Sequence, residues 1–229
     1  MSSPDPYQSQ WPLINEAGFA ERLPGHRMDQ LWSEGWRHFG PRFFRYSLMW
    51  HEQDWKRVFV LRMKVQEWKP SKSQRRTLRR NEDVDVSLAP VNPGEEERAL
   101  FERHKVRFKE NVPSRLEEFL GDDPRQMPCE CLQVSVRKEG RLIAASFLDI
   151  GDHACSSIYG IFEPEERNRR LGIFTIIKEL EEAQRRGLTY YYAGYATHEP
   201  SPYDYKKELK PLQSWSWSGD WQEFDSQSG

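Results

Sequence analysis

The sequence predicts a mixed α/β fold of the α+β type, in which a small N-terminal lobe precedes a larger domain. Two observations support this prediction. Runs rich in aromatic and β-branched residues alternate with apolar stripes of helical spacing, and 9 Trp, 12 Phe and 9 Tyr supply large side chains for a core. Because 37% of the 229 residues are hydrophobic, wholesale disorder is excluded. We expect an irregular arm over residues 1–27, the lobe over 28–90 and the larger domain over 91–229.

The N-terminal half is predicted to contain two helices and a pair of strands. From Met28 onward, apolar residues recur every three to four positions, which indicates a helix. Pro70 ends an extended run, and Ser71 after it is a suitable N-cap. The expected elements are a helix over Met28–Phe39, strands over Arg42–Leu48 and Arg57–Val65, a helix from Ser71 to Arg80 and a loop over most of residues 81–93.

The second half has a different pattern. Helices are expected over Glu95–Lys109 and Arg115–Leu120, followed by strands over Leu132–Arg137, Leu142–Ile150 and Ser156–Phe162, a helix over Leu171–Arg186 and a strand over Leu188–Ala196. The helix from Leu171 is the clearest, because its isoleucines share one face and Gly187 provides a C-terminal stop. The order hairpin, strand, helix, strand is similar to the core of the GNAT acyltransferases, in which the helix start faces the acyl-donor site.

The hydropathy pattern, the cysteine count and the net charge limit where the protein can be located and what it can bind. No apolar run approaches the ~20 residues that a membrane helix needs, and the first ten residues lack the pattern of a secretory signal. Three cysteines do not suggest a disulfide framework. We therefore expect a cytoplasmic protein without a membrane partner. The net charge is only −2, so any nucleic-acid site must depend on a local group of basic residues.

One segment carries such a group. On a helix, its basic side chains would share roughly one face, and no acid within the segment neutralises them. Arginine forks suit phosphate oxygens, so an RNA backbone is one candidate partner. The alternative is a solvated basic face that pairs with acids elsewhere. The residues are Lys72, Arg75, Arg76, Arg79 and Arg80.

A second candidate site is the start of the helix from Leu171. Free N–H groups and the helix dipole make this end, Arg169-Arg170-Leu171-Gly172-Ile173-Phe174, attractive to anions. Acyl-CoA-dependent GNAT enzymes have a small residue two positions after Gly172, where this chain has Phe174. We expect this ring to hinder the pyrophosphate of CoA. The alternative is a plain helix start with two surface arginines.

The tyrosine-rich strand is a third candidate. Regular alternation would place Tyr191 and Tyr195 on one face and Tyr190 and Tyr192 on the other. Aromatic rings beside a cleft could stack on a terminal adenine, and Gly194 could mark a close approach by a ligand. Packing inside a buried strand is the alternative.

Single residues provide weaker signals. Asp149 and Glu163, each near the end of a strand, could orient an amine, although isolated carboxylates are more often surface groups. His198 could be a base or a simple loop residue. Cys129 and Cys131 have no second cysteine pair or close histidine, so no metal site is expected.

Taken together, blocks spread between Met28 and Trp217 resemble the arginyl-tRNA–protein transferases and their bacterial leucyl-transferring relatives. The blocks are Gly35-Trp36-Arg37, Lys69 to Arg76, Asp149-Ile150-Gly151, Cys155 to Tyr159, Phe162-Glu163-Pro164, Leu171 to Phe174, Tyr190 to Tyr195, and Tyr205-Lys206. The resemblance implies a GNAT-like catalytic lobe that uses charged tRNA, and no other cofactor, as acyl donor. No cysteine precedes Cys129, so the family's N-terminal cysteine cluster, and any metal cluster with it, is not expected here.

The resemblance also implies roles for individual residues. Asp149 and Glu163 would hold the acceptor amine of a protein or peptide N-terminus, and Ser157 and Tyr159 would line the cleft. Gly172 would face the terminal phosphates of the tRNA and the basic helix its acceptor stem. The remaining residues expected to bind substrate are Tyr191, Tyr195, His198, Tyr205 and Lys206. Two alternatives stay open: an N-acyltransferase that uses acyl-CoA, and a non-catalytic relative that binds tRNA or protein N-termini.

Overall fold

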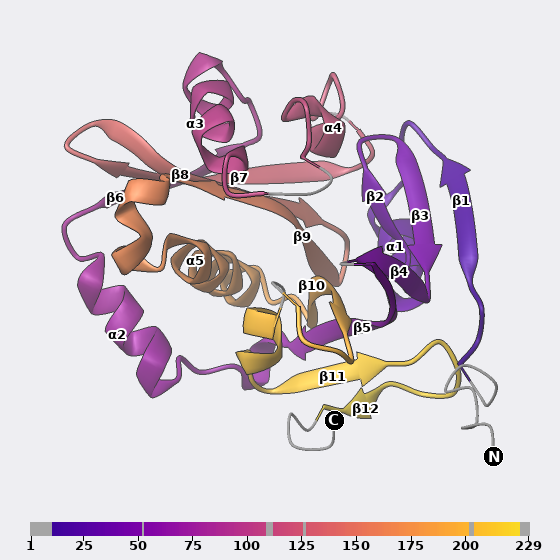
Figure 1. Cartoon of the computed structure of the whole chain (residues 1–229). Coiled ribbons are helices and arrows are strands. Elements are labelled where there is room, and N and C mark those ends of the chain that lie inside the picture. Colours follow the sequence, from indigo (N-terminus) through magenta and orange to yellow (C-terminus); the bar gives the residue numbers. More distant parts are fainter. Residues whose placement is uncertain (1–10, 52, 109–111, 126, 202–203, 225–229) are drawn as a thin grey trace.

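A twisted, mixed sheet forms the centre of the molecule (Figure 1). The computed structural model describes residues 11–51, 53–108, 112–125, 127–201 and 204–224. Within these ranges the sheet has nine strands, in the order β12-β11-β5-β10-β9-β8-β7-β6, with β4 paired to β5. The strands are β4 (Leu48–His51), β5 (Asp54–Lys64), β6 (Asp85–Pro90), β7 (Glu130–Lys138), β8 (Arg141–Ile150), β9 (Ala154–Phe162), β10 (Tyr190–Thr197), β11 (Leu212–Trp215) and β12 (Gln222–Glu223).

Helices cover both faces of this sheet. Figure 1 shows α3 (Glu95–Lys105) and α4 (Glu117–Leu120) on one side, and α5 (Leu171–Arg185) with α2 (Lys72–Arg80) on the other. The apolar stripe of α5 packs on β7, β8 and β9, as its 3.6-residue period predicts, and it shares a core cluster with residues of β5 and β10. Short 3-10 turns lie at Val65–Glu67, Pro164–Arg169 and Asp204–Glu208. No helix among the described residues is long and apolar enough to cross a membrane.

A second, three-stranded sheet flanks the first one. It has the order β1-β3-β2 and consists of β1 (Asn15–Phe19), β2 (Arg37–Phe39) and β3 (Arg42–Tyr46). The helix α1 (Gly25–Ser33) precedes β2 and packs Met28 and Trp32 against β9 and β10. This arrangement brings β2 to the central sheet.

The predicted α+β class, the helix from Ser71 and the order hairpin, strand, helix, strand are confirmed. The expected helix over Met28–Phe39 is wrong in its second half, because Gly35 has a φ of 83° and the chain then enters β2. The expected loop after Arg80 contains β6, which pairs with β7. The predicted end of the third helix, Lys109, lies outside the described residues.

The N-terminal segments do not form an isolated unit. The arm expected over residues 1–27 contains β1, whose five residues are all exposed and therefore show no apolar alternation. Within the segment assigned to the N-terminal lobe, β5 pairs with both β10 and β11 in the central sheet. Trp11 is anchored, because its indole N–H donates to the carbonyl of Ser47 over 2.9 Å.

The pairing of β9 with β10 positions the site. These two strands are parallel, and their register contains only Tyr190 with Ala154, Tyr191 with Cys155 and Tyr192 with Ser156. Both strands continue beyond this point, to Phe162 and Thr197, without pairing to each other. The register of β10 with β5 shifts between Tyr192 and Gly194, which is a β-bulge. The sheet therefore splits where Ser157 follows Ser156.

Candidate functional site

A buried arginine lies where β9 and β10 separate. The guanidinium of Arg37, on β2, donates hydrogen bonds to the hydroxyl of Ser156 and to the carbonyl of Ser157. The second bond satisfies the backbone carbonyl of Ser157, which lies beyond the last pair of β9 with β10. Burial lowers the pKa of Arg37, whereas the nearby Tyr195 and Asp149 act in the opposite direction. The structure thus places a positive charge inside the split.

A buried carboxyl group lies on the α5 side of the same split. Glu179 has no exposed surface, and its Oε2 accepts a 2.5 Å hydrogen bond from the hydroxyl of Tyr191. Burial raises the pKa of Glu179 to about 7, and the hydroxyls of Tyr191, Ser146 and Ser157 oppose this rise. Oε1 has no well-aligned hydrogen bond to any described residue. A carboxyl group with this pKa can gain and lose a proton near neutral pH.

Gly194 provides space for two cationic side chains. Its φ is 92°, and an added Cβ would lie 3.3 Å from Nζ of Lys206 and 3.6 Å from Nη2 of Arg37. Lys206 donates to the carbonyl of Tyr195 over 3.3 Å. Burial, followed by the charge of Arg37, lowers the pKa of Lys206 to about 7. Lys206, predicted to bind substrate, therefore lies beside the split.

Asp149 is also buried, but it faces the N-terminal segment. His38 on β2 shares a hydrogen bond between its Nε2 and Oδ2 of Asp149, and its Nδ1 lies 3.0 Å from the carbonyl of Gly40. The carboxylate of Asp149 thus holds β2, and with it Arg37, against β8.

Glu163 occupies a different place. Its carboxylate accepts hydrogen bonds from Arg103, over 2.8 Å, and from Arg141, over 2.5 Å. Its backbone N–H donates to the carbonyl of Ile143, which is six residues before Asp149 on β8. At the rise of a strand, these positions are about 20 Å apart. The structure therefore does not bring Asp149 and Glu163 together around one amine.

Ser157 and Tyr159 point to opposite faces of β9. Ser157 lies beside Glu179 at the split. The register of β8 with β9 then shifts between Phe147 and Leu148, and Tyr159 stacks on Phe119 with ring centroids 3.8 Å apart, on the α3 and α4 side. Arg37, Glu179 and Lys206 form a polar cluster at the split. Of the four residues predicted to be catalytic, Ser157 adjoins this cluster, and Asp149 supports it from the face of the sheet that contacts β2.

The basic helix is built as the sequence predicts. Ser71 caps α2 in a capping box with Gln74, and Gln74, Thr77 and Asn81 are buried on one side. The opposite side is exposed and carries the five predicted side chains, Lys72, Arg75, Arg76, Arg79 and Arg80. Across the ranges that the structure describes, no ion pair involves any of these five, so their charges are available to a partner.

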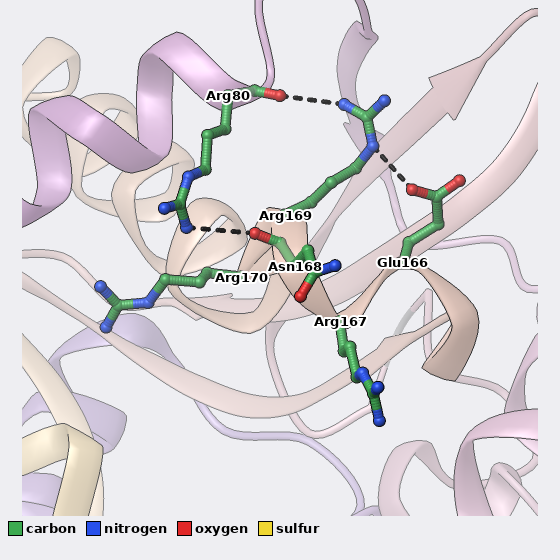
Figure 2. A pocket seen from close by; sticks show the side chains of 6 residues that line it. All are labelled: Arg80, Glu166, Arg167, Asn168, Arg169 and Arg170. Carbon is green, nitrogen blue, oxygen red and sulfur yellow. Dashed lines mark hydrogen bonds and ion pairs between the residues drawn. The ribbon is translucent and has the colours of Figure 1, made fainter.

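A hollow of about 590 Å³ joins this helix to the start of α5 (Figure 2). Arg80 donates to the carbonyl of Asn168 over 3.2 Å, and Arg169 donates to the carbonyl of Arg80 over 3.0 Å. Arg170 donates to Oγ of Ser73 on α2 over 2.7 Å. Figure 2 shows Arg167 and Arg170 extending away from the contact between Arg80 and Arg169. Guanidinium groups therefore predominate in the lining, which also contains Asn168 and the carboxylate of Glu166, paired with Arg169.

The first turn of α5 packs against Phe162, the last residue of β9. A Cβ on Gly172 would lie 3.4 Å from the ring of Phe162, which is ordinary contact. Phe174 is 2% exposed, and its ring packs in the core with Leu171 and Ile143. The expectation that this ring obstructs the donor site is therefore wrong, because the ring points into the core.

The tyrosine strand departs from simple alternation. The bulge between Tyr192 and Gly194 places Tyr195 on the side opposite to Tyr191, where its hydroxyl donates to the carbonyl of Gly35 over 2.7 Å. The prediction that Tyr191 and Tyr195 share a face is therefore wrong. His198 packs on Trp11 and Phe59, and its pKa is lowered by burial and then by Arg57.

Tyr205 lies on the 3-10 turn Asp204–Glu208 and is 37% exposed. Among the described residues, no group of three or more His, Cys, Asp and Glu side chains could hold a metal ion. The three cysteines are buried and free.

Two central members of the cluster were not predicted. Arg37 appeared only as part of a family block, and Glu179 was not singled out at all. A signal for Glu179 did exist, because it occupies the apolar stripe of α5 between Ile176 and Ala183. A carboxylate at a stripe position is rare unless it has a buried polar partner.

The helix α5 connects β9 to β10, two parallel strands that separate with a polar cluster at their split, which is the α+β class expected from the order hairpin, strand, helix, strand. Within this class, the chain belongs to the arginine-tRNA–protein transferase family: the family description "Arginine-tRNA-protein transferase, C terminus" matches residues 96–216, more than half of the chain.

Curated relatives agree with this assignment. The aspartate/glutamate leucyltransferase of Marinobacter nauticus is 29% identical over 86% of this chain and 82% of its own length. The enzyme of the same name from Aeromonas hydrophila is 32% identical, over 72% of this chain and 70% of its own length. Solved structures are more distant. L-PGS from Bacillus licheniformis aligns with a TM-score of 0.46 and 12% identity over 80% of this chain and 53% of its own. A GCN5-related N-acetyltransferase from Sphaerobacter thermophilus aligns with a TM-score of 0.41 and 12% identity, over 86% of this chain and 56% of its own.

Proposed function

We propose that this protein transfers an aminoacyl group from aminoacyl-tRNA to the free α-amine of a protein or peptide N-terminus. The observation that carries the proposal is the placement of the exposed basic face of α2 beside the start of α5. Glu179 is seven residues after Gly172 on that helix, a rise of about 10 Å. An RNA strand held by α2 can thus direct its aminoacylated end toward the split.

The reaction converts an ester into an amide and needs no energy source other than the ester. The amine attacks the ester carbonyl, and a ribose oxygen of the tRNA leaves. Holding the two reactants in line can supply about 7–11 kcal/mol of the barrier. The guanidinium of Arg37, together with Lys206 in its protonated form, supplies positive charge at the split, where an oxyanion would be stabilised. No further cofactor is part of the proposal, and the use of charged tRNA supports a cytoplasmic location as a further part of it.

The transferred amino acid and the acceptor are suggested by the relatives. Their printed names, aspartate/glutamate leucyltransferase, make leucine the first donor to test and peptides with N-terminal Asp or Glu the first acceptors. The name of the family makes arginine the second donor.

The test is incubation of the full chain with a mixed pool of charged tRNAs and a peptide library, read by mass spectrometry. We expect a mass increase of one amino acid at the N-terminus of acceptor peptides. N-acetylated peptides and uncharged tRNA are the controls, and neither should give a product. A mass increase with acyl-CoA instead of charged tRNA, or no transfer from any charged tRNA, would contradict the proposal.

A further inference from the structure

Glu179 is the most deeply buried acid of the cluster, and packing alone does not account for it. It lies on the face of α5 that packs against the sheet, next to Ile176 and Leu180. Burying a carboxylate costs free energy unless it is well paired, and an apolar side chain of similar size would pack there without this cost. One of its oxygens, Oε1, lacks a well-aligned hydrogen bond to any residue in the described ranges. These facts indicate that the carboxyl group serves a purpose other than stability.

Ser157 connects Glu179 to the split. Tyr191, which donates to Oε2, is fully buried, and so is Ser146. Ser157 is partly exposed and lies at the first position beyond the last pair of β9 with β10. Its hydroxyl lies beside both Glu179 and Tyr191. A proton that enters from the split can therefore reach Glu179 through Ser157.

The reaction requires such a route. An α-amine has a pKa of about 7.7–8.0, so at neutral pH most of it is ammonium and cannot attack. We propose that Glu179 accepts the proton of the acceptor ammonium and that the hydroxyl of Ser157 passes this proton to it, an inference that rests on the proposed function.

The step is balanced. The ammonium gives one proton to Oγ of Ser157, and Ser157 gives its own hydroxyl proton to the carboxylate of Glu179. The amine, which still carries two protons, then forms the amide bond as the ester C–O bond breaks, and one of these two protons passes to the leaving ribose oxygen. The proton held by Glu179 returns through Ser157 to solvent, which restores the carboxylate, so that one ammonium and one ester give one amide, one ribose hydroxyl and one released proton.

The surroundings of Glu179 suit this task. Four titratable groups face it: Tyr191 on β10, Cys155 on β9, Cys131 on β7 and Arg37 on β2. Burial raises the pKa values of Tyr191 and both thiols well above their ordinary values, so these three groups stay protonated at neutral pH. The pKa of Glu179, about 7, lies close to that of the amine, which is the condition for efficient proton transfer.

The experiment is the pH profile of kcat/KM for transfer from charged tRNA to an acceptor peptide, with the full chain. In the wild type, the rate should rise with pH up to about 7, because the carboxylate must be ionised to accept a proton. For Glu179→Gln we expect a loss of about 10²–10⁴-fold at pH 7.5 and an acidic limb that moves to the pKa of the amine. Glu181→Gln is the matched control, since Glu181 is an exposed acid on the same helix that pairs with Lys178.

Ser157→Ala provides a second, milder variant in case Glu179→Gln does not fold. It removes one hydroxyl and should lower kcat while leaving the affinity for charged tRNA unchanged. Lys206→Met is a third variant. It tests whether Lys206, which also has a pKa of about 7, produces the acidic limb in place of Glu179.

The outcomes are distinct. An unchanged rate and an unchanged acidic limb in folded Glu179→Gln, or in Ser157→Ala, would overturn the proton route. The same holds if the acidic limb disappears only in Lys206→Met. Absence of transfer by the wild type with every charged tRNA would instead refute the proposed function.

Discussion

The exposed face of α2 and the buried cluster at the split of β9 and β10 use charge in opposite ways. On α2, the basic side chains extend into solvent from one helix, and the nearby Asp83 pairs with Arg169 and not with them. At the split, Arg37 and Glu179 come from β2 and α5 and are almost completely removed from water. Solvent screens the first group, so each residue contributes little to stability. In the second, desolvation is costly, and each member depends on its neighbours.

This contrast predicts two kinds of mutational effect. Substitutions on α2 should change binding of RNA and leave the free energy of unfolding nearly constant. Substitutions at the split should change both stability and the rate of transfer. Four variants test the contrast.

The largest effect is expected for Arg37→Met. The substitution removes two charge-assisted hydrogen bonds, to Ser156 and Ser157, each worth about 1.5–3 kcal/mol. We expect the free energy of unfolding to fall by about 3 kcal/mol or more and transfer to fall at least ~100-fold. Urea denaturation and the transfer assay measure the two quantities.

The control for Arg37→Met is Arg42→Met, an exposed arginine on the neighbouring strand β3. It should change the free energy of unfolding by less than about 0.5 kcal/mol and the rate of transfer by less than about twofold. Equal effects of the two substitutions would show that the burial of Arg37 has no special consequence.

A second prediction concerns Glu179 and the pH dependence of stability. Burial raises the pKa of Glu179 from 4.5 to about 7, so the folded state binds a proton more tightly than the unfolded state. The stabilisation is fully present below pH 4.5 and is lost as the pH rises through 7. Glu179→Gln has no such proton, and at pH 8.5 it should be more stable than the wild type by about 2–3 kcal/mol.

Urea denaturation at pH 5 and pH 8.5 measures this difference. The gain of Glu179→Gln over the wild type should largely vanish at pH 5, and Glu181→Gln should show no gain at either pH. A variant that is more stable at high pH yet slower in transfer would show that the carboxyl group is retained for function at the expense of stability. A loss of stability at pH 8.5 would instead indicate that the ionised carboxylate is well paired.

Much of the exposed region could be predicted from the sequence, because its signals are local. The spacing of the arginines, the Ser71 cap and the apolar stripe of α5 all lie within short windows, and all three are present in the structure. The hairpin of β7 and β8 was predicted for the same reason. By contrast, β1 is exposed along its whole length and leaves no pattern, although backbone pairing with β3 holds it in place.

The buried cluster could not be predicted in this way. Arg37 and Glu179 are 142 positions apart, and only the packing of β2 and α5 around the split brings them together. The bulge at Gly194 reverses the face of Tyr195, and a bulge depends on strand pairing. Asp149 was named, but its partner His38 was not, since their contact depends on how β2 docks.

The third prediction addresses α2. Replacing both Arg75 and Arg76 by Gln should weaken binding of charged tRNA by about tenfold at 150 mM salt. It should also lower the slope of log K against log salt by about 1.5, because two phosphate contacts are lost. The temperature of unfolding should stay within about 2 °C of the wild type, since both side chains are exposed and form no ion pair in the described ranges.

Binding at several salt concentrations, measured by fluorescence anisotropy, tests this prediction. The matched control is Arg22→Gln combined with Arg27→Gln, two exposed arginines near α1 and far along the chain from α2. Equal changes of slope in both double variants would mean that any surface arginine contributes and that α2 is not a specific RNA site.

The smallest effect is expected for Ser73→Ala, at the junction between α2 and the start of α5. The hydroxyl of Ser73 accepts the 2.7 Å hydrogen bond from Arg170, and both groups are near solvent. Its loss should cost about 0.5 kcal/mol of stability or less. If this bond orients Arg170 toward the phosphates of the tRNA, the affinity should fall by about twofold to threefold, and Ser73→Thr should restore it. An unchanged affinity in Ser73→Ala would mean that Arg170 binds RNA without help from α2, and that the two elements act as separate contacts.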